Sequence, residues 1–114
     1  MKINFKEIKP IIKIVNDSKY PSLFAYVSLK LVDEHERALT VNGFTIRKSK
    51  FDGKPYLTPP TKRTGMSFFK FVLIDNSLWK EIEKEVLSKY EYNNIPIIGR
   101  LIIIIIRFFW YNLV

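Results

Sequence analysis

The sequence contains no cysteine, which excludes disulfides, thiolate metal sites and cysteine nucleophiles. Histidine occurs once, at His35, inside the charged segment 33–37. No glycine-rich phosphate-binding loop is found, and no hydroxyl or carboxylate has a recognisable catalytic partner in the sequence. These absences argue against an enzyme, and we expect neither a cofactor nor a metal site.

A signal-peptide core is also missing, because residues 1–10 alternate charged and apolar side chains. We therefore expect a cytoplasmic protein. The 114 residues are 47% apolar and 26% charged, a composition typical of one folded domain with one core. The sequence divides into a domain at 1–92 and an apolar tail at 93–114.

Positive charge is abundant and unevenly distributed. The formal net charge is +8, and residues 47–70 alone contain seven lysines and arginines against one carboxylate, Asp52. Residues 71–92 are net acidic. An excess of this kind favours an acidic partner, such as nucleic acid, a membrane surface or an acidic protein.

Alternation of apolar and polar residues predicts a series of short strands. Residues 3–15 are interrupted by Pro10 and indicate two short strands with a turn between them. Residues 24–32 are rich in aromatic and β-branched side chains, and 39–51 continue the pattern after a polar loop. Gly43 lies inside the last run, which indicates a bulge or a close backbone approach.

A hairpin is predicted next, around Asp52-Gly53, because both central residues of a type I′ turn need positive φ. Residues 54–57 would form the returning strand, which Pro59-Pro60 ends by removing two N–H donors. Residues 61–65 are then expected to be an exposed loop tip. Residues 67–74 have the composition of a buried strand.

A helix is predicted at 77–92. Residues 75–77 offer three good N-cap side chains, and apolar positions recur at helical spacing. One stripe of the helix contains Leu78, Ile82, Val86 and Tyr90. Several strands followed by one helix indicate the α+β class, a small and mostly antiparallel sheet with the C-terminal helix packed on one face.

The candidate site residues lie on the hairpin and on the proline-stiffened segment that follows it. Arginine can grip a phosphate with two hydrogen bonds, lysine acts as a point charge, and threonine hydroxyls can bond phosphate oxygens. Most aromatic side chains are expected in the core, but Tyr56 lies beside the cations and could stack on a base. The candidate residues are Lys48, Lys50, Lys54, Tyr56, Thr61, Lys62, Arg63 and Thr64.

The tail leaves three alternatives open. Residues 95–114 are long enough to cross a bilayer, but Arg100 and Arg107 interrupt them at a cost of about 2.5–3.5 kcal/mol each near the bilayer centre. The tail could contact a membrane, add a strand at an oligomer interface, or have no selected role.

The stretch from Leu23 to Tyr90 resembles the SpoVG family, the stage V sporulation protein G or septation regulators. Residues 39–65 resemble that family's glycine-containing strand, hairpin and Pro-(Ser/Thr)-Lys-Arg-Thr loop, onto which Pro60–Thr64 fall. Residues 67–79 and 82–92 resemble its last strand and its helix. The resemblance implies a small bacterial α+β domain, commonly dimeric, that binds DNA and RNA and regulates gene expression or cell-division septation.

The sequence therefore predicts a nucleic-acid-binding regulator that forms a homodimer and has no catalytic activity. The alternative is a membrane-associated or oligomerising protein that acts through residues 95–114 and does not bind nucleic acid.

Overall fold

The computed structural model describes residues 2–16, 19–94 and 97–113. Its helices and strands are β1 (Phe5–Ile14), β2 (Leu23–Asp33), β3 (Ala38–Lys48), β4 (Pro55–Thr58), β5 (Thr61–Thr64), β6 (Ser67–Lys70), α1 (Asn76–Asn94) and α2 (Ile97–Leu113).

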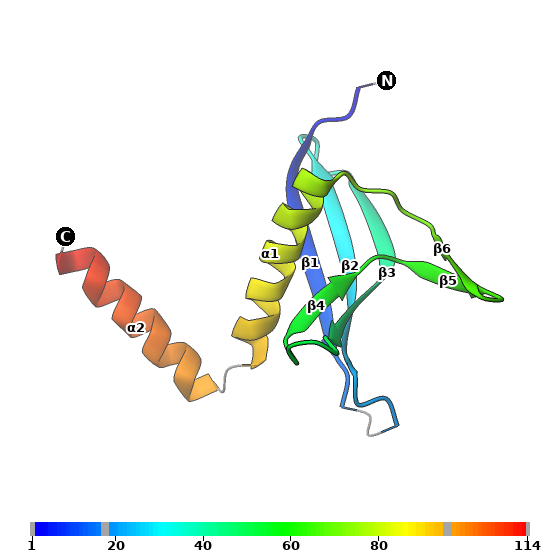
Figure 1. The fold of residues 1–114 in the computed structure, drawn as a ribbon. Coiled ribbons are helices and arrows are strands. Elements are labelled where there is room, and N and C mark those ends of the chain that lie inside the picture. The colour runs from blue at the N-terminus through cyan, green and yellow to red at the C-terminus, as the bar shows by residue number, and fades with distance from the viewer. Residues whose placement is uncertain (1, 17–18, 95–96, 114) are drawn as a thin grey trace.

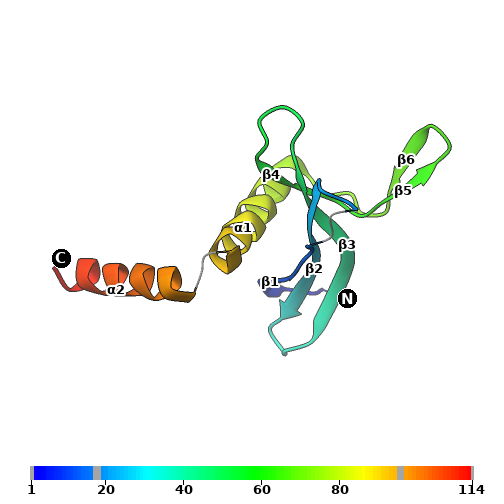
Figure 2. The ribbon, with the colours of Figure 1, turned by 90° about the horizontal axis from the view of Figure 1, so that it is seen from below.

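The fold has two layers, an antiparallel sheet in the order β1-β2-β3-β4 and the helix α1 on one of its faces (Figure 1). The strands β5 and β6 form a separate two-stranded ribbon that projects from the other side. Figure 2 shows α2 extending away from the sheet on the side of α1. The predicted α+β class, with a helix packed on one sheet face, is confirmed.

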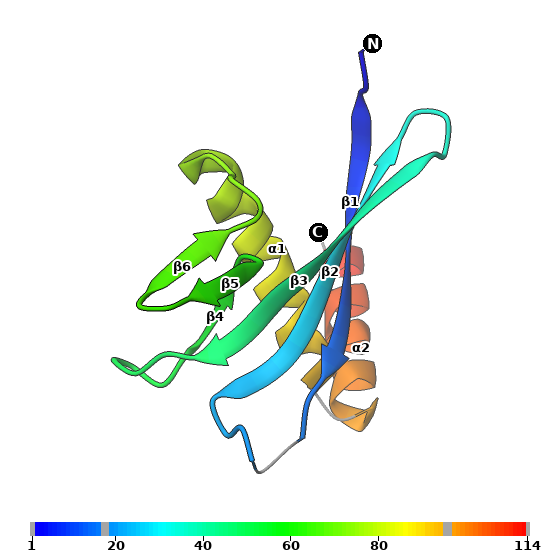
Figure 3. The same ribbon diagram turned by 90° about the vertical axis from the view of Figure 1, so that its right-hand side faces the viewer.

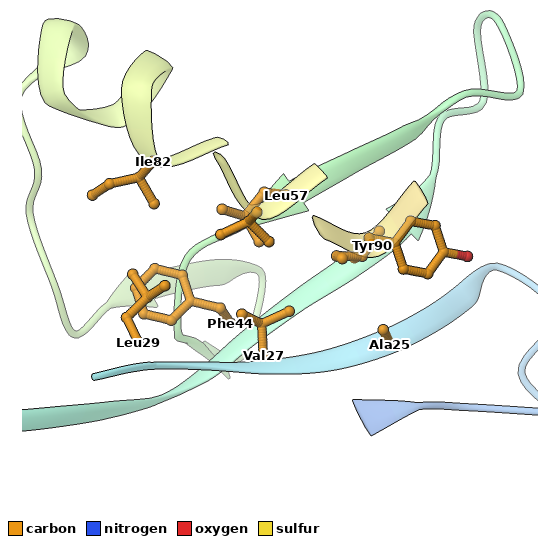
Figure 4. Close-up of a cluster of buried hydrophobic side chains, with 9 residues drawn as sticks. Ala25, Val27, Leu29, Phe44, Leu57, Ile82 and Tyr90 are labelled. Carbon is orange, nitrogen blue, oxygen red and sulfur yellow. The ribbon is translucent and has the colours of Figure 1, made fainter. Parts of the chain in front are cut away.

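The core lies between the sheet and α1. Its residues recur at the spacing typical of strands in the sheet and at the spacing typical of helices in α1. Alternate residues of β2, β3 and β4 are buried, and residues three or four apart on α1 meet them (Figure 4). Of the predicted helix stripe, Ile82, Val86 and Tyr90 are buried, whereas Leu78 stays partly exposed. The core consists of Ala25, Val27, Leu29, Phe44, Ile46, Leu57, Ile82, Val86 and Tyr90.

The prediction of two short strands in 3–15 is wrong, because β1 runs through Pro10 without a break. Pro10 is tolerated since β1 is an edge strand. Its carbonyl oxygen accepts a hydrogen bond from the Lys89 ammonium of α1. The N and O atoms of one strand residue point the same way, so the missing N–H also faces outward, where no neighbouring strand needs it.

The opposite edge of the sheet has a matching contact. The backbone N–H of Leu57, in β4, donates to Oε2 of Glu83 on α1 at 3.3 Å. The helix thus satisfies an outward acceptor on β1, through Lys89, and an outward donor on β4, through Glu83.

The predicted bulge at Gly43 is confirmed. The pairing of β2 with β3 shifts register between Val27 and Leu29, and Gly43 has a φ of 99°. A Cβ added there would lie 3.1 Å from Cβ of Pro60. Glycine is needed for both reasons, because the backbone conformation is left-handed and Pro60 packs directly on it.

The connection between β2 and β3 is organised by Asp33. Its Oδ1 accepts hydrogen bonds from the backbone N–H groups of His35 (2.9 Å) and Arg37 (2.8 Å), and Oδ2 accepts one from Nε of Arg37 (2.7 Å). Glu36 adopts a positive φ of 61° inside this turn. Burial acts to raise the pKa of Asp33, but these hydrogen bonds outweigh it and hold the pKa below 3.8.

The lowered pKa of Asp33 predicts a pH effect on stability. The stabilisation by its carboxylate is complete above the unfolded-state value of 3.8 and is lost as the pH falls through the lower folded-state pKa. We expect the free energy of unfolding, measured by urea titration at several pH values, to fall more steeply below pH 4 in the parent than in Asp33→Asn. Parallel curves for the two proteins would contradict this role.

The helix α1 begins and ends close to the predicted positions. Asp75 is its N-cap, since Oδ1 accepts from the backbone N–H of Leu78 at 2.9 Å and from the Ser77 hydroxyl at 2.9 Å. These two hydrogen bonds lower the pKa of Asp75. Trp79 lies beside the core and stacks on Phe44, with ring centroids 6.3 Å apart.

The predicted hairpin exists, but its turn is not the two-residue type I′ turn. The strands end at Lys48 and resume at Pro55, so residues 49–54 form the connection. Gly53 has a φ of 72°, whereas Asp52 does not have a positive φ. The Gly53 N–H donates to the Ser49 carbonyl at 3.1 Å, which closes a wider loop than Asp-Gly alone predicts.

The segment 61–74 differs most from prediction. Residues 61–64 are the strand β5 rather than a loop tip, and the turn lies at Gly65-Met66. The expected buried strand at 67–74 is limited to β6, whose residues are all exposed. Phe68 and Phe69 are 70% and 58% exposed, because the ribbon has no layer packed on it within the described chain.

The tail forms a helix, α2, so the alternative of an added strand is wrong. Its large apolar side chains whose burial the structure describes are exposed: Leu101, Ile102, Ile104, Ile105, Ile106, Phe108, Phe109, Trp110 and Tyr111. No helix among the described residues is both long enough and apolar enough to cross a membrane.

Candidate functional site

The cations that end β3 border a pocket of about 460 Å³ at the mouth of the β3–β4 hairpin. The pocket combines three cations, two serines and two aromatic rings, and its residues come from the β1–β2 connection, from β3 with its loop, and from β4. It is lined by Ser22, Arg47, Lys48, Ser49, Lys50, Phe51 and Tyr56.

Backbone hydrogen bonds hold these segments together. The Lys48 N–H donates to the Ser22 carbonyl at 2.8 Å, which joins the end of β3 to the chain entering β2. The Ser49 N–H donates to the Lys54 carbonyl at 2.9 Å and closes the loop. The backbone from which the three cations extend is therefore held by the sheet as well as by the loop.

Asp52, the carboxylate nearest in sequence, is used by the loop itself. Its Oδ1 accepts from the Lys54 N–H at 2.9 Å, and this hydrogen bond is the main reason that the pKa of Asp52 lies below 3.8. Asp52 therefore stays ionised at neutral pH, but it does not line the pocket. Lys54 also lies outside the pocket lining, although sequence reasoning grouped it with Lys48 and Lys50.

The pocket cations are not neutralised by ion pairs within the described part of the chain. The ion pairs found there join Lys6 to Glu36, Lys9 to Glu7 and Arg37 to Asp33. The α1 glutamates lie elsewhere: Glu83 bonds the edge of β4, and Glu81 and Glu85 line a different pocket beside β1. Positive charge at the hairpin is thus available to a ligand.

The second group of predicted residues lies on the ribbon, and it is divided. Alternation along β5 places Thr61 and Arg63 on one side and Lys62 and Thr64 on the other. All four are exposed, and Nε of Arg63 donates to the Gly65 carbonyl at 3.2 Å. The ribbon and the 49–54 loop are separate projections in Figure 2, so these residues do not join the hairpin pocket.

Sequence reasoning missed four pocket residues, Ser22, Arg47, Ser49 and Phe51. Arg47 and Lys48 are neighbours on a regular strand and so point to opposite faces, yet both border this pocket because it lies at the end of β3. The position of Ser22 in the pocket could not be predicted from its neighbours in the sequence, because it depends on the pairing of segments that are distant in the sequence. Tyr56, which was predicted, is 41% exposed at the pocket edge.

The described residues contain no cluster of three or more histidine and carboxylate side chains that could hold a metal ion. Comparisons with models of protein families, with curated proteins and with solved structures give no significant match to this chain.

Proposed function

We propose that the protein binds nucleic acid without catalysis, and that the β3–β4 hairpin makes the phosphate contacts. The observation that supports this most directly is the pocket in which Arg47, Lys48 and Lys50 converge beside Tyr56 without a carboxylate in its lining. A cationic concavity with an aromatic edge matches a phosphate backbone with an adjacent base.

Each pocket residue has a role that its chemistry allows. Nε of Arg47 donates to Oγ1 of Thr45 at 3.2 Å, which leaves its two terminal amino groups for phosphate oxygens. Lys48 and Lys50 would add mobile point charges. The hydroxyls of Ser22 and Ser49 can donate to phosphate oxygens, as in many nucleic-acid interfaces.

The salt dependence of binding tests this proposal. If the protein contacts about four phosphates of a duplex, log K falls with log[salt] at a slope of about −3.6. In Lys48→Ala/Lys50→Ala we expect weaker binding and a slope shallower by about 1.8, because up to two phosphate contacts are lost. Fluorescence anisotropy with a labelled oligonucleotide at several salt concentrations measures both quantities.

The matched control is Lys80→Ala/Lys84→Ala, which removes the same charge from exposed positions on α1. It should leave the slope unchanged. The variant Lys62→Ala/Arg63→Ala asks separately whether the ribbon contributes. Equal slopes for the parent and the hairpin variant would refute phosphate contact at the pocket.

A role like that of the SpoVG regulators belongs to the same proposal. It rests on the sequence resemblance at 23–90 and on the α+β fold, which agrees with it. A homodimer and a cytoplasmic location remain predictions. The exposed rings Phe68, Phe69 and Phe71, on and beside the ribbon, would be the surface for a second copy.

A second candidate function is supported by α2. Its exposed apolar side chains include Ile105, Phe109 and Trp110, and the helix has two arginines but no acidic residue. Such a helix is suited to lie in a membrane interface or to pack against another copy. This candidate does not require nucleic-acid binding.

A further inference from the structure

The sheet has an outer face, opposite α1, that no helix covers (Figure 3). Strand pairing shows which residues share it, because directly opposed residues point to the same side. Tyr26 pairs with Lys13 on β1 and with Thr45 on β3, and Thr45 pairs with Thr58 on β4. The Oγ1 atoms of Thr45 and Thr58 are hydrogen-bonded, which confirms that this row lies on one face.

The neighbouring rows extend the same surface. Tyr56 pairs with Arg47, and Ser28 donates to Oδ1 of Asn42 at 2.6 Å. Lys30 pairs with Lys9. The face therefore presents two tyrosines, Tyr26 at 50% and Tyr56 at 41% exposure, within a field of hydroxyl, amide and ammonium groups.

Charge on this face is strongly one-sided. Lys13, Lys30 and Arg47 form no ion pair within the described chain, and Lys9 lies 3.7 Å from Glu7, toward the far end of β1. Between these cations the face has no carboxylate at any paired position. The exposed Ile11 lies in the same row, between Lys9 and Lys13. The rings of Tyr26 and Tyr56 with the unpaired cations around them are complementary to a polyanion with exposed bases.

We infer that this outer face binds single-stranded nucleic acid by stacking bases on Tyr26 and Tyr56. This inference rests on the proposed nucleic-acid function and adds the class of ligand and a second part of the interface. The two tyrosines are two strands and two residues apart, about 12 Å by sheet geometry, so they can take two separate bases. Duplex bases are already stacked on each other and cannot use these rings.

The face continues directly into the hairpin pocket. Arg47 and Tyr56 belong to both, because they line the pocket and pair with each other across β3 and β4. A strand with its phosphates in the pocket would place its following bases over Tyr56 and then Tyr26. Lys13, beside Tyr26, would meet the backbone farther along.

The test compares an unstructured single-stranded oligonucleotide with a duplex of the same length, both labelled, with the full chain at fixed salt. We expect the parent to bind the single strand more tightly. Tyr26→Ala and Tyr56→Ala should each weaken single-strand binding about tenfold and leave duplex binding nearly unchanged. Tyr26→Phe and Tyr56→Phe should retain binding, because the ring and its packing remain. Tyr111→Ala, which removes an exposed ring from α2, is the control.

The outcomes separate the two levels of the proposal. In one outcome, the parent binds a probe, Lys48→Ala/Lys50→Ala weakens that binding, and the tyrosine variants bind as the parent does. Stacking on the sheet face is then refuted, and the proposal of phosphate contacts at the hairpin stands. Duplex preference in the parent, or an equal loss for both probes in the alanine variants, also overturns single-strand stacking. Absence of binding to both probes refutes the proposed function together with this inference.

Discussion

Phe44→Ala should lower the free energy of unfolding by about 3–5 kcal/mol, the range found when a buried phenylalanine is truncated. Phe44 is 1% exposed and stacks on Trp79 of α1. The surrounding backbone cannot easily move in to fill the cavity. Gly43, the preceding residue, is held against Pro60, and Ile46, two residues farther along the strand, is buried. Urea denaturation followed by tryptophan fluorescence measures the loss.

Leu39→Ala is the matched control on the same strand. Leu39 is 56% exposed, so its truncation should change the free energy of unfolding by about 0.5 kcal/mol or less. A loss below about 1 kcal/mol for Phe44→Ala would mean that α1 does not pack on the sheet through this ring. A variant too unstable to purify agrees with the prediction, and Phe44→Leu then provides a measurable smaller loss.

Ile105→Glu/Phe109→Glu should abolish association through α2. Both side chains are exposed on the described chain and lie one helical turn apart. Covering each of them contributes about 1.5–3 kcal/mol, so their loss should weaken association by at least about 100-fold. Sedimentation velocity measures self-association, and flotation with vesicles of anionic and neutral phospholipid measures membrane binding.

Lys84→Glu is the control for this experiment, because it changes the net charge in the same direction on the exposed side of α1. It should sediment and float as the parent does. If the parent is a monomer that does not float, α2 has neither role. Retained oligonucleotide binding in the Ile105→Glu/Phe109→Glu variant would show that the domain acts independently of its tail.

The sequence predicted the parts of the fold that depend on local periodicity and caps. The stripe on α1, the Asp75 cap and the bulge at Gly43 each follow from a few neighbouring residues. The path of β1 through Pro10 was not predictable, because a proline ends a strand unless that strand lies at a sheet edge with its N atom outward. Edge position is a property of the assembled sheet.

The ribbon shows the limit of composition as evidence. The sequence SFFKF is typical of a buried strand, yet Phe68 and Phe69 are exposed, because no other part of the described chain covers β5 and β6. Burial depends on which partner an apolar strand meets, and that partner can be another molecule. The pocket residues depend on the assembled structure in a similar way. The place where β3 ends and the width of the 49–54 loop decide that Arg47, which was not predicted, lines the pocket and that Lys54, which was predicted, does not.

The contacts of Lys89 and Glu83 with the two outer strands have a consequence for assembly. A free strand edge is a template on which another chain can extend a sheet, and proteins that leave one open are prone to fibrillar growth. Here α1 forms a hydrogen bond with one backbone group on each edge strand, β1 and β4. Pro10 also removes one N–H donor from the edge of β1. The two helix contacts and the proline therefore interrupt the row of backbone groups to which an added strand would bond, so strand addition across those positions is disfavoured.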